Sequence, residues 1–130
     1  MNRLQQQTFD SEMAQAIVLI EAGDIDGGFV HLERAHVIGQ AHVIPHVQSH
    51  WHMLRVYMIR GRAFAVFGQA IRIIFGALGS AVGVVPTGNT GGSDISMFRR
   101  MPIDPLLQKL IDGKSDTDGD ARKYPSQGNK

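Results

Sequence analysis

The chain has 130 residues, of which 43% are hydrophobic, and a formal net charge of +1. This length fits one domain with its own core, and the small net charge argues against a polyanionic partner held by bulk charge. The chain has no cysteine, which excludes disulfides, thiolate catalysis and sulfur-rich metal sites.

The apolar segments predict neither a signal peptide nor a membrane span. The N-terminal residues are polar, and the longest apolar run, residues 73–85, contains three glycines. A helix needs about 20 apolar residues to cross a bilayer. We therefore expect a soluble cytoplasmic protein that makes no membrane contact.

Charge is distributed unevenly along the chain. Residues 1–33 carry one arginine and six acidic residues, whereas residues 34–93 carry five arginines and no acidic residue. Regions of opposite charge are expected to face each other, or one of them faces a partner. Five arginines without lysines or a known binding motif do not favour nucleic-acid binding.

Two helices are predicted in the first 40 residues. Ser11 is a suitable N-cap and predicts a helix over residues 11–22, which Gly23 ends. Acidic turn residues then favour a second helix over residues 26–40.

Two further helices and a short last one follow. Pro45 suits a first helical turn and predicts a helix to about Ile59 that buries Trp51 and Met58. After Gly61 the pattern predicts a fourth helix, whose inner stripe would be Phe64, Phe67, Ile71, Ile74 and Leu78. The segment after it is glycine-rich and irregular, and its valines Val82, Val84 and Val85 are expected to be buried. Pro105 opens a short helix with the sequence PLLQKLI.

A weak internal repeat indicates the architecture. A shift of 38 residues superposes Gly23 on Gly61 and Arg34 on Arg72, as in a repeated helical hairpin. We predict an all-α domain over residues 1–111, with two hairpins in a compact four-helix arrangement, either tetratricopeptide-like or a bundle. Residues 112–130 are polar and predicted to be a disordered tail.

All six histidines lie between residues 31 and 52, and two pairs have helical ligand spacing. Glu33 and His36 are three residues apart, and His46 and His50 are four apart, so each pair shares a helix face. A di-iron centre is not expected, because no acidic residue between 34 and 93 could partner Glu33. A mononuclear site formed by Glu33, His36, His46 and His50 suits zinc, nickel, copper(II) or iron(II).

The alternative is that these histidines belong to the core. His36 and His50 would then bond to the backbone or to Gln40, and Glu33 would pair with an arginine. Two glycine–glutamine pairs, Gly39-Gln40 and Gly68-Gln69, also allow close helix approach with amides bonding across it.

The loop PTGNTGG is a weak candidate for anion binding, through the backbone of Gly88, Asn89, Thr90 and Gly91. It lacks the lysine of a phosphate-binding loop. A tight turn with Asn89 and Gly91 in left-handed conformations is the favoured interpretation.

Four segments together resemble a known family: LERAHVIGQ, HVQSHWHML, GQAIR and GNTGG. The chain resembles the bacterial family of domain of unknown function 3703 over roughly residues 10–111. The family pattern falls on residues 32–40, His46, His50, Gly68, Gln69, Arg72 and residues 88–91. The resemblance implies small proteins often encoded in mobile or metal-resistance contexts, and it supports treating His36, His46 and His50 as one unit.

Two functions remain open from the sequence. One is a small metal-handling accessory that binds one divalent transition metal. The other is a non-catalytic helical-hairpin module that binds a protein partner or a second copy of the chain. An enzyme is not favoured, because no serine or lysine has a recognisable nucleophile setting.

Overall fold

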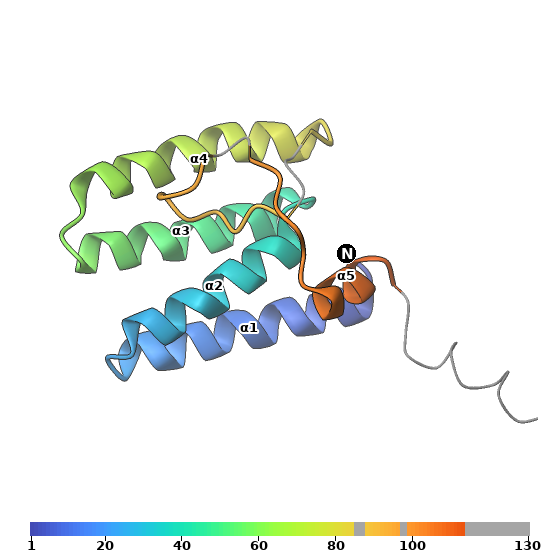
Figure 1. Cartoon of the computed structure of the whole chain (residues 1–130), viewed down its shortest axis with the longest axis horizontal. Helices are drawn as coiled ribbons and strands as arrows, with labels where there is room; N and C mark the ends of the chain where they lie inside the picture. The colour runs from blue at the N-terminus through green and yellow to red at the C-terminus, as the bar shows by residue number, and fades with distance from the viewer. Residues whose placement is uncertain (85–87, 97–98, 114–130) are drawn as a thin grey trace, which may run out of the picture.

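The computed structural model describes residues 1–84, 88–96 and 99–113, which form five α-helices and no strand. The four long helices are α1 (Arg3–Glu21), α2 (Ile25–Gly39), α3 (Val43–Ile59) and α4 (Ala63–Ala81), and the short one is α5 (Pro105–Ile111). Two antiparallel hairpins, α1–α2 and α3–α4, meet through α2 and α3 (Figure 1). The predicted all-α class and the paired hairpins are confirmed.

The two hairpin turns have the same backbone construction. Gly23 and Gly61 both have positive φ, 91° and 64°, a conformation that glycine adopts at little cost. The N–H of Gly23 donates to Ile20, and the N–H of Gly61 donates to Met58, at equivalent positions of the 38-residue repeat. The repeat is thus present in the geometry of the turns.

Helix α1 begins earlier than the sequence predicted. Its N-cap is Asn2, not Ser11, because Asn2 and Gln5 form a reciprocal capping box. Gln5 also donates to the carbonyl of Ile111, which ties the start of α1 to the end of α5. The predicted start at Ser11 was wrong because the capping box lies well upstream of the first apolar run.

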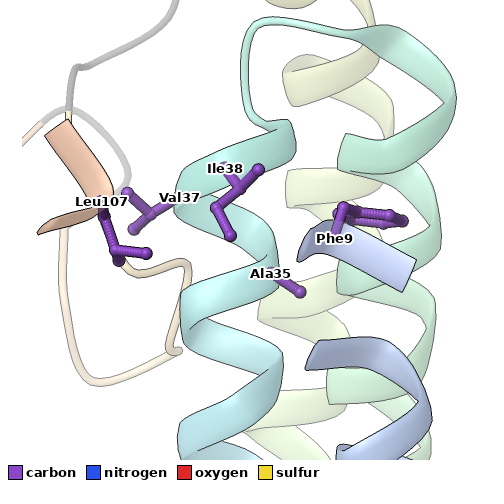
Figure 2. Packing of buried hydrophobic residues seen from close by; sticks show 5 residues of the cluster. All are labelled: Phe9, Ala35, Val37, Ile38 and Leu107. Atoms are coloured by element: carbon purple, nitrogen blue, oxygen red, sulfur yellow. The ribbon is translucent and has the colours of Figure 1, made fainter. Parts of the chain in front are cut away.

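The core has two neighbouring clusters along the first hairpin. One joins α1, α2 and α3 through Ala16, Leu32, Met53 and Val56. The other joins α1, α2 and α5 (Figure 2), with Leu107 and Val37 on one side of α2 and Phe9 on the other. Burial of α2 on both sides fixes the position of its last turn, where the candidate site lies.

Helix α4 turns its apolar stripe outward, contrary to the sequence prediction. Phe64 is 95% exposed, and Phe67, Ile74 and Leu78 are each more than half exposed, while Ile71 is only partly buried. The face of α4 that packs inward instead carries Ala65, Gln69 and Arg72. Trp51 and Met58 of α3, predicted to be buried, are also about half exposed.

The chain beyond α4 returns across the helices. Residues 88–96 run along α3, and residues 99–104 lead to α5, which lies beside the start of α1 (Figure 1). Val82 and Val84 are largely exposed, so their predicted burial was wrong. Val85 and the predicted disordered tail from residue 114 onward lie outside the described residues. None of the described helices combines the length and the apolar content needed to cross a membrane.

Candidate metal centre

Three buried histidines converge at the junction of the two hairpins. His36 lies in the last turn of α2, and His46 and His50 lie one turn apart on α3; their exposures are 3%, 5% and 2%. One ring nitrogen from each histidine lies within 4.8 Å of the other two. The Nε2 atoms of His46 and His50 are 3.0 Å apart and form a hydrogen bond between the two rings. Within the described residues, this is the group whose side chains could hold a metal ion.

A tight connection between α2 and α3 brings the three histidines together. A Cβ at Gly39 would lie 2.7 Å from the Cβ of Pro45, so only glycine lets the end of α2 approach the first turn of α3 this closely. His46 and His50 share one face of α3 because they are four residues apart. The sequence therefore directs both rings of α3 toward the last turn of α2.

The hydrogen bonds of His50 fix its tautomer. Its Nδ1 lies 2.6 Å from Oε1 of Gln69, whose Nε2 donates to the carbonyl of Gly91 and to Ser93. Because the amide nitrogen is used for donation, Gln69 offers its oxygen to His50. His50 therefore carries its proton on Nδ1, and its Nε2 presents a lone pair to the cluster.

His36 is oriented in the same way by Ser49. The Ser49 hydroxyl donates its only proton to the carbonyl of His46, and its Oγ lies 3.2 Å from Nδ1 of His36. Ser49 must then accept from His36, which leaves Nε2 of His36 unprotonated. Two of the three imidazoles thus have their outer nitrogens bonded as in metal sites, where a further shell of hydrogen bonds orients the ligands.

Burial keeps the three imidazoles neutral. Desolvation is the largest cause that lowers the pKa of all three histidines, and together with the neighbouring His46 and Arg72 it brings the pKa of His50 to about 3. The positive charge of Arg72 lowers the pKa values of His36 and His50 further. Neutral imidazole is the form that binds a metal ion, so this burial favours the ligand form of all three side chains.

The loop after α4 covers the cluster. A Cβ at Gly91 would lie 3.1 Å from the rings of both His36 and His50, and Gly91 has a φ of +84°. The positive φ favours glycine at this position, and the short distances leave little room for a side chain between the loop and the two rings. Gln69 donates to the carbonyl of Gly91. The same side chain therefore bonds to His50 and to the loop that covers it.

Asn89 holds this loop in place from within. Its amide donates to the carbonyls of Ser96 and Arg99, and its oxygen accepts from the N–H of Gly91. The positive φ of Gly91 confirms half of the predicted turn, but Asn89 does not have a left-handed conformation. The Gly91 N–H, which an anion nest would need, is already bonded. The hydrogen bond from Gly91 to Asn89 therefore argues against anion binding. Anion binding stays a prediction for the four loop residues Gly88, Asn89, Thr90 and Gly91.

Glu33 lies beside the cluster and not within the converging set. Its Oε1 would be 3.3 Å from a Cβ at Gly92, the residue next to the one that covers the histidines. Burial raises its pKa, and the Thr90 side chain partly offsets that rise. No arginine or lysine in the described part of the chain pairs with it. Glu33 also lines a surface cleft of about 190 Å³, with Thr90 and Gly88.

Comparison with known proteins assigns the chain to a family. The family model described as Protein of unknown function (DUF3703) matches residues 3–111. The chain belongs to the DUF3703 family. No curated protein and no solved structure matches it. The resemblance noted in the sequence is confirmed, and the family supplies no activity.

The remaining histidines of this DUF3703 protein lie outside the cluster. Nδ1 of His31 is 2.6 Å from Glu12, which also pairs with Arg34. His42 and His52 are partly exposed. His52 follows His50 by two residues, on another face of the same helix, which makes it a natural control position.

Three residues of this DUF3703 protein support the cluster but were not predicted as part of it. Ser49 and Gln69 orient the imidazoles, and a Cβ at Gly76 would lie 2.7 Å from Nε2 of His46. The pair Gly68-Gln69 had indicated an amide bonding between helices, and Gln69 of α4 does bond to His50 of α3. Its specific partner depends on tertiary packing, which residue spacing alone does not reveal.

Proposed function

We propose that the protein binds one divalent transition-metal ion through His36, His46 and His50. Three neutral imidazoles within reach of one point form a ligand set that suits zinc, nickel, copper(II) or iron(II). The observation that carries the proposal is the outward hydrogen bonding of His36 and His50, which turns their Nε2 lone pairs toward the cluster.

The distances are close to what a metal requires. Zinc–nitrogen bonds of 2.0–2.1 Å in tetrahedral geometry imply nitrogen atoms about 3.3 Å apart. The Nε2 atoms of His46 and His50 are 3.0 Å apart, and the other separations are at most 4.8 Å. Rotations that move the ring nitrogens by about 1 Å would therefore complete the three-nitrogen geometry.

Glu33 is the proposed fourth ligand. It lies one helical turn before His36, and a Cβ built at Gly91 would meet His36 while one built at the next residue, Gly92, would meet Glu33. A carboxylate would offset the charge of the ion, which three neutral imidazoles and the nearby Arg72 do not. Burial raises the pKa of this half-buried carboxyl, and a nearby cation would favour its ionised form.

The enclosure of the site favours retention of the ion over catalysis. Structural metal sites are closed by protein ligands, whereas catalytic sites keep an open position for water or substrate. Here the Gly91 segment lies against the His36 and His50 rings, and all three histidines are buried. The function that fits is a metal-handling accessory that stores, carries or senses the ion.

Metal analysis of untagged protein tests this proposal. Protein stripped with chelator, reconstituted with each candidate ion and desalted is expected to retain about one equivalent of the preferred ion. Co(II) is expected to give the visible absorption of a tetrahedral complex. Retention below about one-tenth equivalent for every ion, with no rise in melting temperature, would contradict the proposal, because ligands that bind the native state stabilise it.

A further inference from the structure

Helix α4 carries a second feature, an apolar face with no partner within the described chain. We define the α4 stripe by the large exposed apolar side chains of α4 and of the residue that follows it, Phe64, Phe67, Ile74, Phe75, Leu78 and Val82. With 3.6 residues per turn, the five positions within α4 fall on one side of the helix. The inward side of α4 contacts α3 and the covering loop through Ala65, Gln69 and Gly76.

The size of the stripe exceeds what a monomer usually exposes. A fully exposed aromatic residue offers about 150–250 Å², and aliphatic residues somewhat less. With the observed exposures of 58–95%, the six side chains present on the order of 700 Å². The largest apolar patch of a typical monomer is about 300–600 Å². A standard interface buries about 800 Å² per partner, so the stripe alone nearly supplies one side of it.

We infer that a second copy of this chain packs on the α4 stripe, with the two α4 helices side by side about a two-fold axis. Such a contact is self-complementary, because each apolar residue meets the same apolar stripe on the partner. The one charged residue of α4 is Arg72, which is turned inward and donates to the carbonyl of Ile95. No charge is therefore buried or repelled when two α4 stripes meet.

The charged residues elsewhere do not compete for this role. Two of the six acidic residues of the first hairpin form ion pairs with arginines of the chain, Glu12 with Arg34 and Asp26 with Arg60. Part of the predicted attraction between the acidic and basic regions is therefore found within one chain. The α4 stripe itself is apolar, so it matches another apolar surface better than a charged partner.

A lipid surface fits the stripe less well. Helices that bind in the membrane interface carry lysine and arginine on the polar face that meets the headgroups. The polar face of α4 is Gln69 and Arg72, and both are buried against the rest of the protein. The helix therefore has no basic residues to offer to anionic lipids.

Sedimentation velocity over about 1–100 μM tests the inference, using the full chain. The wild type is expected to be a dimer whose dissociation changes little between low and high salt. Phe67→Glu and Ile74→Lys are each expected to weaken dimerisation by more than about 10-fold, because each places a charge in an apolar contact. Both side chains are exposed in the monomer, so circular dichroism should show unchanged folding.

Val18→Glu is the matched control, since Val18 is an exposed valine on α1, away from the stripe. It is expected to remain dimeric. A wild type that stays monomeric at 100 μM would overturn the inference, as would a dimer that survives both α4 substitutions. Two other results would also overturn the inference, because each would show that something other than a second copy covers the α4 stripe. One is a monomer that dimerises only after residues 114–130 are deleted. The other is a monomer that binds anionic vesicles through Phe67.

Discussion

The ring of His46 packs against Gly76 of α4, in space that a side chain at residue 76 would fill. A Cβ at residue 76 would lie 2.7 Å from Nε2 and 2.8 Å from Cε1 of that ring. Real Cβ atoms do not approach another atom so closely, so any side chain at this position must displace His46. Helix α4 therefore shapes the candidate metal centre without contributing a ligand from this position.

Gly76→Ala is expected to lower metal affinity at least about 10-fold. Alanine favours a helix over glycine by about 1 kcal/mol, so the change would otherwise be neutral or stabilising. The displaced imidazole is the reason for the loss. Competition with a chromophoric chelator would measure the affinity.

Gly68→Ala is the matched control on the same helix. A Cβ at Gly68 would meet Oγ of Ser93 at 3.5 Å, an ordinary contact. This variant should keep its metal affinity and melt slightly higher than the wild type. Equal affinities for Gly76→Ala and Gly68→Ala would show that the position of His46 is irrelevant to binding.

Gln69→Leu is expected to weaken both the site and the fold. Gln69 is fully buried, and its loss would leave Nδ1 of His50 and the carbonyl of Gly91 without their partners. Each unsatisfied buried group costs about 1–3 kcal/mol. Loss of a residue that orients a metal ligand typically lowers affinity about 10–100-fold. Chemical denaturation and metal titration should show both effects, and full affinity in the variant would contradict the role of Gln69.

Glu33→Gln separates a four-ligand site from a three-histidine site. If the carboxylate joins the ion, the amide should lower metal affinity at least about 10-fold while the metal-free protein keeps its stability. Glu12→Gln, which removes an acidic residue paired with His31 and Arg34, should leave the affinity unchanged. An unchanged affinity in Glu33→Gln would restrict the ligands to the three histidines and leave the fourth position to solvent.

The sequence predicted most of the helices because their ends depend on local chemistry. Pro105 restricts its own backbone to a helical start, and α5 begins there as predicted. Gly61 adopts the positive φ of the turn that ends α3. Periodicity also grouped the α4 side chains correctly on one face. It could not say which way that face points, because that depends on what packs against the helix. Burial of Gln69 and Arg72, which bond to His50 and Ile95, turns the apolar stripe outward.

The site was partly predictable for the same reason. Helical spacing alone brought His46 and His50 together, and the short connection between α2 and α3 adds His36. Ser49, Gln69 and Gly76 act across helices that are joined only in the folded protein. Their roles become visible when the distances are known.

Acid should destabilise the metal-free protein because of the three histidines. Their pKa values in the folded state lie below 6.5, that of His50 at about 3, so the unfolded state binds more protons below pH 6.5. Stability is therefore expected to be level above about pH 7 and to fall as pH decreases from 6.5 toward 3. Each histidine contributes a slope of about 1.4 kcal/mol per pH unit where the two states differ by one proton.

His50→Gln provides the check on this slope. Urea denaturation at several pH values, in the presence of chelator, should give a pH dependence shallower by up to one proton than that of the wild type. An identical slope in the two proteins would mean that His50 does not remain neutral in the folded state.

The metal dependence of the melting temperature tests the central claim most directly. Wild type, His46→Gln, His50→Gln and the control His52→Gln would be melted with and without one equivalent of the preferred ion. We predict that the ion raises the melting temperature of wild type and His52→Gln by several degrees, and that both cluster variants lose most of this rise. Equal shifts in all four proteins, or no shift in any, would contradict the account and leave the three histidines as a hydrogen-bonded part of the core.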